Sequence, residues 1–395
     1  MNRGALNHAS SDSAAHTLLT KAERVVIKIG SALLFDPKTG LQTDWMAGLA
    51  ADVAALKQAG KQVILVSSGS IALGRDSLGM PTGRIKLDEK QAAAATGQIQ
   101  LAQAWMEALR PHNIKAAQIL LAPEDTETRR RHLNARATMQ RLLDYGVVPV
   151  VNENDTITTY EIRFGDNDRL AARVAAMMSA DVLILLSDID GLYHKNPRQH
   201  DDARHIPVID EITDEVLQMG GSANSDFASG GMATKLAAAR IATTSGVAMI
   251  ICDGQTTAPL SALSQGAQAS LFTAKLAPST ARKNWILSAL ETEGQVMIDS
   301  GAVGALRGGK SLLPAGVTHV SGQFDRGDLI DIADQEGVVL ARGLAGYAHQ
   351  EAIQLMGQKS TDFESIIGYE GRAELVHADD IVLMNGAERQ KTDRS

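Results

Sequence analysis

The sequence predicts an α/β fold, a three-layer αβα sandwich with a mostly parallel sheet, followed by a small β-rich, barrel-like module. In the first part of the chain, short apolar runs alternate with longer helical stretches. Strands separated by helices imply right-handed crossovers, a parallel sheet and helices on both of its faces. In the last part, short strands follow one another with turns between them, a pattern typical of a small β domain.

The apolar runs are expected to be the strands of the first domain, because each is four to eight residues long and is bounded by turns or helical stretches. They lie near 24–29, 63–66, 116–121, 147–151, 182–186 and 247–252. The expected helices lie near 44–59, 90–110, 132–145, 167–179 and 232–245. Residues 194–230 break this alternation with His, Asn, Pro and charged residues, and we expect a short hairpin and a lid there.

Five segments are predicted along the chain. Residues 1–20 mix Asn, Ser, Ala and His without the apolar core of a signal peptide, so a flexible extension is expected. The α/β domain is placed at 21–275 and a linker at 276–290, because hydrophobic periodicity is lost in residues 253–284. The β-rich module follows at 291–380, and the polar residues 381–395 are expected to form a flexible tail.

Composition narrows the class of protein. With 395 residues, of which 44% are hydrophobic, the chain is long enough to bury the cores of two domains. Cys252 is the only cysteine, so no intrachain disulfide can form, and its apolar surroundings indicate a buried strand thiol rather than a nucleophile. The ten histidines show no metal-ligand spacing, and no metal-binding residue is predicted. Without an apolar stretch of membrane-spanning length, a cytoplasmic location is expected.

The net charge of −8 lies entirely in residues 285–395, which hold 9 Lys and Arg against 17 Asp and Glu. The negative electrostatic field of this segment repels a polyanion, so nucleic acid is not an expected partner of it.

The basic run 129–131 follows Glu124, Asp125 and Glu127 and indicates a solvated helix start. Residues 304–311 match the Walker A pattern, but Pro314 and Gly316 prevent a helix after Lys310, so we predict a strand-connecting turn instead.

Two polar clusters, 152–155 and 165–168, follow the apolar run that ends at Val151. Parallel sheets bind ligands at the carboxyl ends of their strands, where the first cluster is expected to lie. Asn and Asp side chains can hold a zwitterion or organise a phosphate-bound cation there. They are also common turn residues, so this pattern alone leaves a ligand site and a pair of turns equally open.

Three further segments favour an anion site. Lys28 stands near the end of an apolar strand, where it is costly to bury unless it meets an anion. The turn 67–70 leads from a strand into an Ala-rich helix and offers free backbone N–H groups. Residues 229–235 form a glycine-rich approach to a helix with a lysine in its first turn. Taken alone, each of the first two segments is better explained as an ordinary βα turn.

Together these motifs resemble the amino acid kinase family, and the C-terminal part resembles a PUA domain. The matching segments fall in order between about residues 23 and 378: 25–31, 66–74, 133–136, 148–155, 165–168, 185–193 and 230–235, then 311–317 and 347–357. The chain departs from the family pattern at Ser31-Ala32, where Thr-Ser is more frequent, at Ser187, where Thr is usual, and at Ala233, where Ser is common. These departures bear on fine nucleotide contacts rather than on the reaction.

The resemblance implies ATP-dependent phosphorylation of the γ-carboxylate of L-glutamate, the first step of proline synthesis, with proline as an inhibitor. It implies that Lys28 and Lys235 neutralise the moving charge and that Asp168 positions them. It assigns glutamate binding to Ser68, Gly69, Asp155 and Asn167. It assigns ATP binding to Lys28, Ser187, Asp188, Ser229, Gly230, Gly231, Met232, Ala233, Thr234 and Lys235. Mg²⁺ is expected mainly through the ATP phosphates.

The family also implies a homo-oligomer, either a dimer or a tetramer, and handover of a labile acyl phosphate to glutamate-5-semialdehyde dehydrogenase. Two alternatives stay open from the sequence. One is another carboxylate or carbamate kinase of the same family. The other is an RNA-binding regulator in which the kinase fold only senses metabolites.

Overall fold

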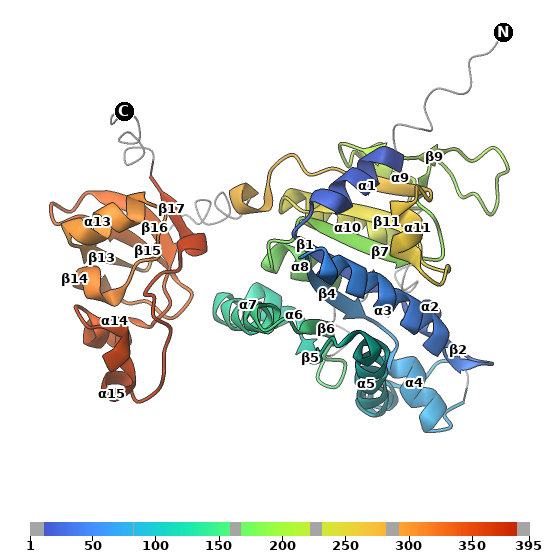
Figure 1. Cartoon of the computed structure of the whole chain (residues 1–395), viewed down its shortest axis with the longest axis horizontal. Helices are drawn as coiled ribbons and strands as arrows, with labels where there is room; N and C mark the ends of the chain where they lie inside the picture. The colour runs from blue at the N-terminus through green and yellow to red at the C-terminus, as the bar shows by residue number, and fades with distance from the viewer. Residues whose placement is uncertain (1–11, 82, 159–166, 222–230, 282–291, 385–395) are drawn as a thin grey trace, which may run out of the picture. The chain divides into compact units, whose positions relative to one another are not determined.

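The computed structural model describes residues 12–81, 83–158, 167–221, 231–281 and 292–384. The chain forms two compact units, one of residues 1–127 and 134–278 and the other of residues 128–133 and 279–395 (Figure 1). The division after Pro278 falls within the segment 276–290 that the sequence analysis assigned to a linker, and the described residues stop at 281 before resuming at 292.

One sheet organises the first unit, and within the described residues its strand order is β10-β12-β11-β7-β1-β4-β6-β5. Neighbouring strands are parallel except β11 and β12, so the predicted mostly parallel sheet is confirmed. The strands are β1 (Arg24–Ile29), β4 (Gln62–Ser67), β5 (Ala116–Leu121), β6 (Val148–Glu153), β7 (Val182–Ser187), β10 (Val208–Ile209), β11 (Ala248–Asp253) and β12 (Ala269–Phe272). Short hairpin pairs are β2 (Phe35–Asp36) with β3 (Gly40–Leu41) and β8 (Leu192–Tyr193) with β9 (His205–Ile206).

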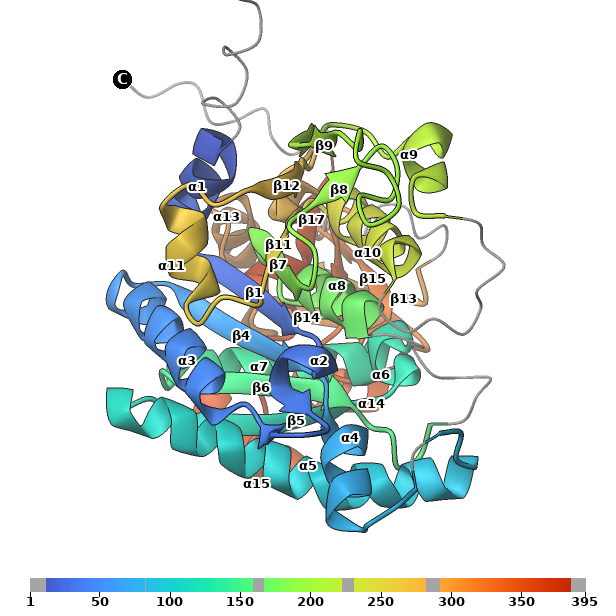
Figure 2. The ribbon, with the colours of Figure 1, turned by 90° about the vertical axis from the view of Figure 1, so that its right-hand side faces the viewer.

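Helices cover both faces of this sheet. The longer ones are α1 (Asp12–Lys21), α3 (Thr43–Gln58), α5 (Leu87–Leu109), α7 (Arg129–Asp144), α8 (Asn167–Met177) and α10 (Met232–Thr244). The shorter ones are α2 (Ser31–Leu34), α4 (Ser70–Ser77), α6 (Pro123–Glu127), α9 (Asp214–Gln218), α11 (Pro259–Ser264) and the 3-10 turn η1 (Arg110–His112). Figure 2 shows α3 and α11 on one side of the strands and α8 and α10 on the other.

Side-chain alternation along β1 explains the two layers. Val25, Ile27 and Ile29 pack into the core that includes residues of α3, α5 and α11. Val26, between them, packs into the core that includes residues of α8 and α10. Because successive side chains of a strand point to opposite faces, a central strand needs an unbroken apolar run. That run is what made these strands predictable.

The flexible extension expected at 1–20 is wrong for residues 12–20, which belong to helix α1. Ala15 and Leu19 lie one helical turn apart and are buried in the core beside α11. Their spacing of four residues gives a short apolar stripe, which the surrounding polar residues hid at the sequence level. Residues 1–11 lie outside the described part of the chain, as does 385–395, which includes most of the predicted tail.

The hairpin expected within 194–230 begins earlier than predicted: β9 (His205–Ile206) lies inside that segment, but its antiparallel partner β8 (Leu192–Tyr193) precedes it. The lid expected in the same segment stays a prediction, because residues 222–230 lie outside the described residues. The helix expected at 132–145 begins earlier, at Arg129, which confirms that the basic run 129–131 forms a helix start.

Cys252 is buried on β11, and burial raises the pKa of its thiol to about 12, as expected for an unreactive strand residue. Among the described helices, none has the length and apolar character needed to cross a membrane.

The second unit is built on a five-stranded sheet with the order β14-β13-β15-β16-β17, which confirms the predicted β-rich module. Its elements are β13 (Gly294–Ile298), α13 (Ser300–Arg307), η2 (Pro314–Gly316), β14 (Val317–Gly322), β15 (Leu329–Ala333), β16 (Val339–Leu344), α14 (His349–Leu355), η3 (Ser360–Asp362), α15 (Phe363–Ile367), η4 (Ala378–Asp380) and β17 (Ile381–Leu383). Val296, Ile330 and Ile332 form its core with Leu355 and Phe363.

The Walker-like segment 304–311 lacks the geometry of a phosphate loop. Helix α13 ends at Arg307, before Lys310, and the chain then passes through the bridge at Leu312 to the 3-10 turn Pro314–Gly316. The expectation of a strand-connecting turn is nevertheless wrong for residues 304–307. They form the end of α13, because Asp299 caps that helix by accepting a hydrogen bond from the N–H of Ala302 at 2.7 Å.

Helices α4 and α5 pack through glycines. A Cβ atom added at Gly97 would lie 1.9 Å from the carbonyl oxygen of Ser70, and one at Gly74 would lie 1.7 Å from the carbonyl oxygen of Ala93. The two backbones are therefore in direct contact, which only residues without a side chain permit. Since Ser70 opens α4, this contact also fixes the turn that follows β4.

We expect Gly97→Ala to destabilise the protein by about 1–3 kcal/mol, because its methyl group would push α5 away from the backbone of Ser70. Gly304→Ala is the matched control, since this glycine lies in helix α13 with nothing within 4 Å of an added Cβ. That control should be neutral or slightly stabilising. Calorimetric unfolding of both variants provides the test, and equal melting temperatures would contradict the close packing.

Candidate active site

Polar residues gather at the carboxyl ends of three neighbouring strands. β1, β4 and β6 are adjacent and parallel, so the turns that follow them meet at one edge of the sheet. Lys28 is the penultimate residue of β1, Ser68 and Gly69 follow β4, and Asn152 lies near the end of β6. Gly69 adopts φ of 111°, a left-handed conformation that favours glycine, and it is the N-cap of α4.

A buried charge cluster lies at this edge. The Lys28 ammonium is 2.6 Å from Oδ1 of Asp168, and the Lys235 ammonium is 3.3 Å from Oδ2 of the same carboxylate. Asp168 is fully buried and both lysines are 4% exposed. The hydroxyl of Thr234 also donates to Asp168 Oδ2, at 3.2 Å. The structure thus joins all three residues expected to be catalytic, and they come from β1, α8 and α10.

Two opposing effects act on the pKa of Asp168. Burial disfavours its charged form, while the two nearby ammonium groups favour it, and the ammonium groups prevail. The pKa of this carboxyl therefore lies below its ordinary value, and Asp168 is ionised at neutral pH. A buried carboxylate between two lysines holds both ammonium groups in place.

A chain of buried amide side chains begins at the preceding residue, Asn167. Asn167 donates through Nδ2 to Ser68 Oγ at 2.7 Å and to Asn152 Oδ1 at 2.8 Å. Asn152 in turn donates through Nδ2 to Gln98 Oε1 at 2.7 Å. Of the expected glutamate residues, the structure therefore brings Asn167 and Ser68 into direct contact.

The sequence analysis did not single out Gln98, and it named Asn152 only as part of a polar cluster. Gln98 lies on the face of α5 that also buries Ala94, Leu101 and Trp105. A glutamine at helical spacing within an apolar face was the signal that could have identified it. Their hydrogen bond connects α5 to the end of β6, and both residues are at least nine-tenths buried.

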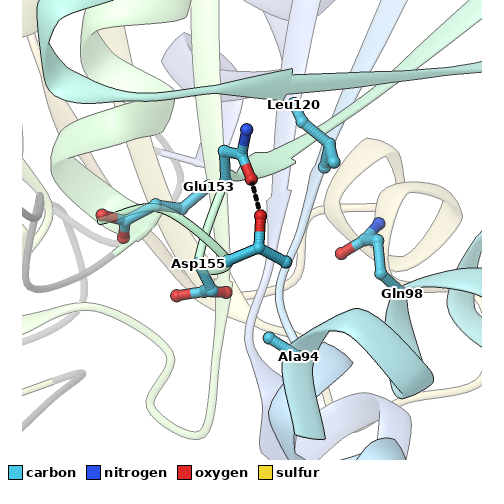
Figure 3. A pocket seen from close by; sticks show the side chains of 7 residues that line it. Ala94, Gln98, Leu120, Glu153 and Asp155 are labelled. Carbon is cyan, nitrogen blue, oxygen red and sulfur yellow. Dashed lines mark hydrogen bonds between the residues drawn. The ribbon is translucent and has the colours of Figure 1, made fainter. Parts of the chain in front are cut away.

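A small pocket lies beside this chain (Figure 3). It is lined by Ala94 and Gln98 of α5, Leu120 of β5 and residues 153–156. Figure 3 shows Gln98 on the helix side and the carboxylates of Glu153 and Asp155 on the loop side. Asp155 also accepts a hydrogen bond from Ser70 Oγ at 3.4 Å, which links the pocket to the turn after β4. Ser68, Gly69 and Asn167 do not line the pocket itself.

The residues expected to hold a nucleotide lie after β7 and at the start of α10. Ser187 ends β7 and is buried, while Asp188 is half exposed. Gly231 is the N-cap of α10 without a side-chain cap, so the N–H groups of Met232 and Ala233 point out of the first turn. Such a helix start suits a phosphate group. Ser229, Gly230, Gly165 and Asp166 lie outside the described residues.

Two lysines, a helix start and small-residue turns can neutralise and orient an anion, and the amide chain offers fixed donors and acceptors next to them. Within the described ranges, no group of three or more His, Cys, Asp or Glu residues could hold a metal ion.

Comparison with known proteins identifies relatives of both units. Residues 23–253 match the model of the amino acid kinase family, and residues 294–367 match the model of the PUA domain. Glutamate 5-kinase of Rhizobium rhizogenes is 55% identical over 369 residues, which cover 93% of this chain and 95% of that protein. Glutamate 5-kinase of Paramagnetospirillum magneticum is 52% identical over 366 residues, 92% of this chain and 99% of that protein.

Among solved structures, carbamate kinase from Giardia lamblia bound to AMP-PNP matches 65% of this chain and 100% of its own, with 16% identity and a TM-score of 0.47. The family assignment rests on the two family models and on the relatives, which span nearly the whole chain. The resemblances to the amino acid kinase family and to a PUA domain are thereby confirmed.

We expect Asp168→Asn to lower the free energy of unfolding by about 3–5 kcal/mol at neutral pH, because it leaves two buried ammonium groups without their carboxylate. The folded state lowers the pKa of Asp168 below the ordinary value of 3.8. Its stabilising effect is therefore complete above that value and is lost as the pH falls through the lower folded value.

Urea unfolding of both proteins between about pH 7 and pH 3 is the measurement, and the gap between them should narrow toward the acid end. Asp76→Asn, at an exposed position of α4, is the control and should change little. A gap that stays constant down to the acid end would contradict the assignment.

Proposed function

The chain belongs to the amino acid kinase family, and from that premise we propose that it transfers the γ-phosphoryl group of ATP to the γ-carboxylate of L-glutamate. The product is γ-glutamyl phosphate, the first intermediate of proline synthesis. The observation that carries the proposal is the convergence of Lys28 and Lys235 on Asp168, beside the amide chain at the same sheet edge. The names of the relatives, glutamate 5-kinases at above 50% identity, support glutamate as the acceptor.

The chemistry fits this set of residues. The γ-carboxyl of glutamate has a pKa of roughly 4.3, so the nucleophile is ionised at neutral pH and needs no general base. Its oxygen forms a bond to the γ-phosphorus while the bond from phosphorus to the bridging oxygen of ADP breaks, and ADP leaves with the electron pair. The protein must bring two anions together in line and neutralise the moving charge. Lys28 and Lys235 perform that task, and Asp168 holds them in position.

Glutamate binding falls to the turn after β4, the loop after β6 and the start of α8. Ser68 and Asn167 already share a hydrogen bond, and Gly69 allows the left-handed turn that follows β4. The Asp155 carboxylate faces the α-ammonium group of glutamate. The amide chain through Asn152 fixes which way the Asn167 amide points, because each end of it has a defined partner.

ATP occupies the other side of the lysine pair. Ser187 and Asp188 lie at the end of β7, and residues 229–235 include the free N–H groups at the start of α10. These groups suit phosphates, and Mg²⁺ would be held mainly through the ATP phosphates and water. When bound, the cation supplies further charge neutralisation on the transferring group.

Three further properties belong to the same proposal. Proline inhibits at or beside the glutamate site. The protein acts as a homo-oligomer, a dimer or a tetramer, in the cytoplasm. The labile acyl phosphate passes to glutamate-5-semialdehyde dehydrogenase.

The acceptor is the decisive test, because other carboxylate and carbamate kinases share the sheet and the lysines. Phosphoryl transfer is to be assayed with glutamate, aspartate, N-acetylglutamate and carbamate under the same conditions. Turnover should be highest with glutamate. Preference for another acceptor would refute the proposed substrate while leaving the kinase assignment intact.

We expect Lys28→Ala and Lys235→Ala each to lower kcat by at least about a hundredfold, because both ammonium groups act on charge in the transition state. The KM for glutamate should change much less. Lys310→Ala is the matched control, since this lysine belongs to the Walker-like segment that lacks a following helix. Steady-state kinetics measure all three variants. A near-normal kcat with weaker substrate binding would show that the lysine concerned has another role.

We expect Asp155→Asn to raise the KM for glutamate at least about tenfold, or about 1.4 kcal/mol, by removing the charged partner of the substrate ammonium. Its kcat at saturating glutamate should fall less. Asp76→Asn again serves as the control. Unchanged glutamate saturation would mean that Asp155 only shapes the turn.

A further inference from the structure

The segment that follows β7 is a hairpin whose base is fixed by β12. Ser270 is fully buried, accepts a hydrogen bond from the N–H of Leu192 at 2.7 Å and donates to the carbonyl of Ile206 at 2.6 Å. Gln268 donates to Asp190 Oδ2 and to the Tyr193 hydroxyl, both at 2.8 Å. Both strands of the hairpin are thus tied to the sheet close to Asp188.

Local bonds also fix the tip of this hairpin. Asn196 Oδ1 accepts from the N–H of Arg198 at 2.9 Å, and the Asn196 carbonyl accepts from the N–H of His200 at 3.1 Å. An ion pair between Lys195 and Asp202 closes the loop. These bonds therefore hold the backbone of Arg198 in a defined position.

From that position the Arg198 side chain reaches back to the beginning of the hairpin. Its Nη2 donates to Asp188 Oδ2 at 2.7 Å and to the Asp188 carbonyl at 3.2 Å. The hydroxyl of Ser187 donates to the other carboxylate oxygen, Oδ1, at 3.2 Å. Each oxygen of this carboxylate thus has a donor, and the carbonyl of the same residue shares the donor of Oδ2.

The pair is a weak contributor to folding, because the side chains of Arg198 and Asp188 are 67% and 51% exposed. A surface pair of this kind orients a group more than it stabilises a fold. Burial tends to raise the pKa of Asp188, but the hydrogen bond and charge of Arg198 prevail and lower it. Asp188 is accordingly a carboxylate at neutral pH.

We propose that Arg198 is a positioning residue for the nucleotide, which holds the carboxylate and the carbonyl of Asp188 in the orientation that receives ATP. The inference rests on the proposed function, because it takes Ser187 and Asp188 as part of the nucleotide site. Arg198 itself is not assigned a contact with ATP. Its effect passes through Asp188, which makes the inference separable by experiment.

The first experiment compares Arg198→Ala, Arg198→Lys and Lys195→Ala in the full-length protein. Lys195→Ala is the matched control, since it removes an ion pair of the same loop that does not touch Asp188. Arg198→Ala should raise the KM for ATP about threefold to fivefold, the size expected for one exposed charged pair, while kcat and the KM for glutamate change much less. Arg198→Lys should recover part of the loss, because an ammonium keeps the charge but lacks the planar guanidinium.

The second experiment is a double-mutant cycle with Asp188→Ala, in which calorimetry measures binding of a non-hydrolysable ATP analogue with Mg²⁺. If Arg198 acts through Asp188, Arg198→Ala should weaken binding in the parent but cause no further loss in the Asp188→Ala background. Thermal unfolding of each variant should stay within a few degrees of the parent, which separates positioning from loss of structure.

Every other outcome contradicts either the inference or the proposed function. If Asp188→Ala weakens nucleotide binding and Arg198→Ala does not, the inference fails while the proposed function stands. If Arg198→Ala still weakens nucleotide binding in the Asp188→Ala background, Arg198 contacts the nucleotide itself, and the inference is overturned. If Lys195→Ala weakens nucleotide binding as much as Arg198→Ala does, the loop as a whole is responsible, and the inference is overturned as well. If Asp188→Ala has no effect on the nucleotide, the assignment of Asp188 under the proposed function fails first.

Discussion

The fold of the first unit depends on a buried cluster of two ion pairs that share one carboxylate. Asp168 is inaccessible to solvent and lies between the ammonium groups of Lys28 and Lys235. Charges in such a position are tolerated only when their partners are held at close range, so β1, α8 and α10 have to converge at one point. Asp168 is the second residue of α8, where the helix dipole favours a carboxylate. Lys235 lies in the first turn of α10, where the dipole opposes a cation, and it is this carboxylate that compensates.

The strands and the lysine cluster could be predicted because their signals are local. A strand buried on both faces needs a continuous apolar run, and β1, β4, β6, β7 and β11 each contain one, with polar residues only at or near the strand ends. Lys28 and Lys235 stood out as cations in short motifs next to buried segments. Their common partner, Asp168, was implied only by the resemblance to the amino acid kinase family, since no spacing within the chain points to it.

What the sequence could not provide are contacts between residues far apart in the chain. The hydrogen bond from Asn152 to Gln98 spans 54 residues and exists only because α5 packs beside the end of β6. The Arg198–Asp188 pair depends on how the hairpin folds back. Helices α1 and α13 were missed for another reason: polar or glycine-rich composition suggested loops, while burial of Ala15 and Leu19 and the cap at Asp299 decided for helix. Tertiary packing outweighed local propensity in α1, whereas a local cap decided for helix in α13.

The candidate site has two halves, the amide chain and the lysine pair, which are stabilised by different interactions. The dipeptide Asn167-Asp168 joins them. In one half, neutral amides and hydroxyls are linked by hydrogen bonds whose directions are fixed. In the other half, two ammonium groups, a carboxylate and a helix start lie together. Asn167 belongs to the first network and Asp168 to the second, and both open the same helix. A shift of the start of α8 would therefore disturb the amide network and the carboxylate between the lysines together, so the two halves are coupled through two adjacent peptide units.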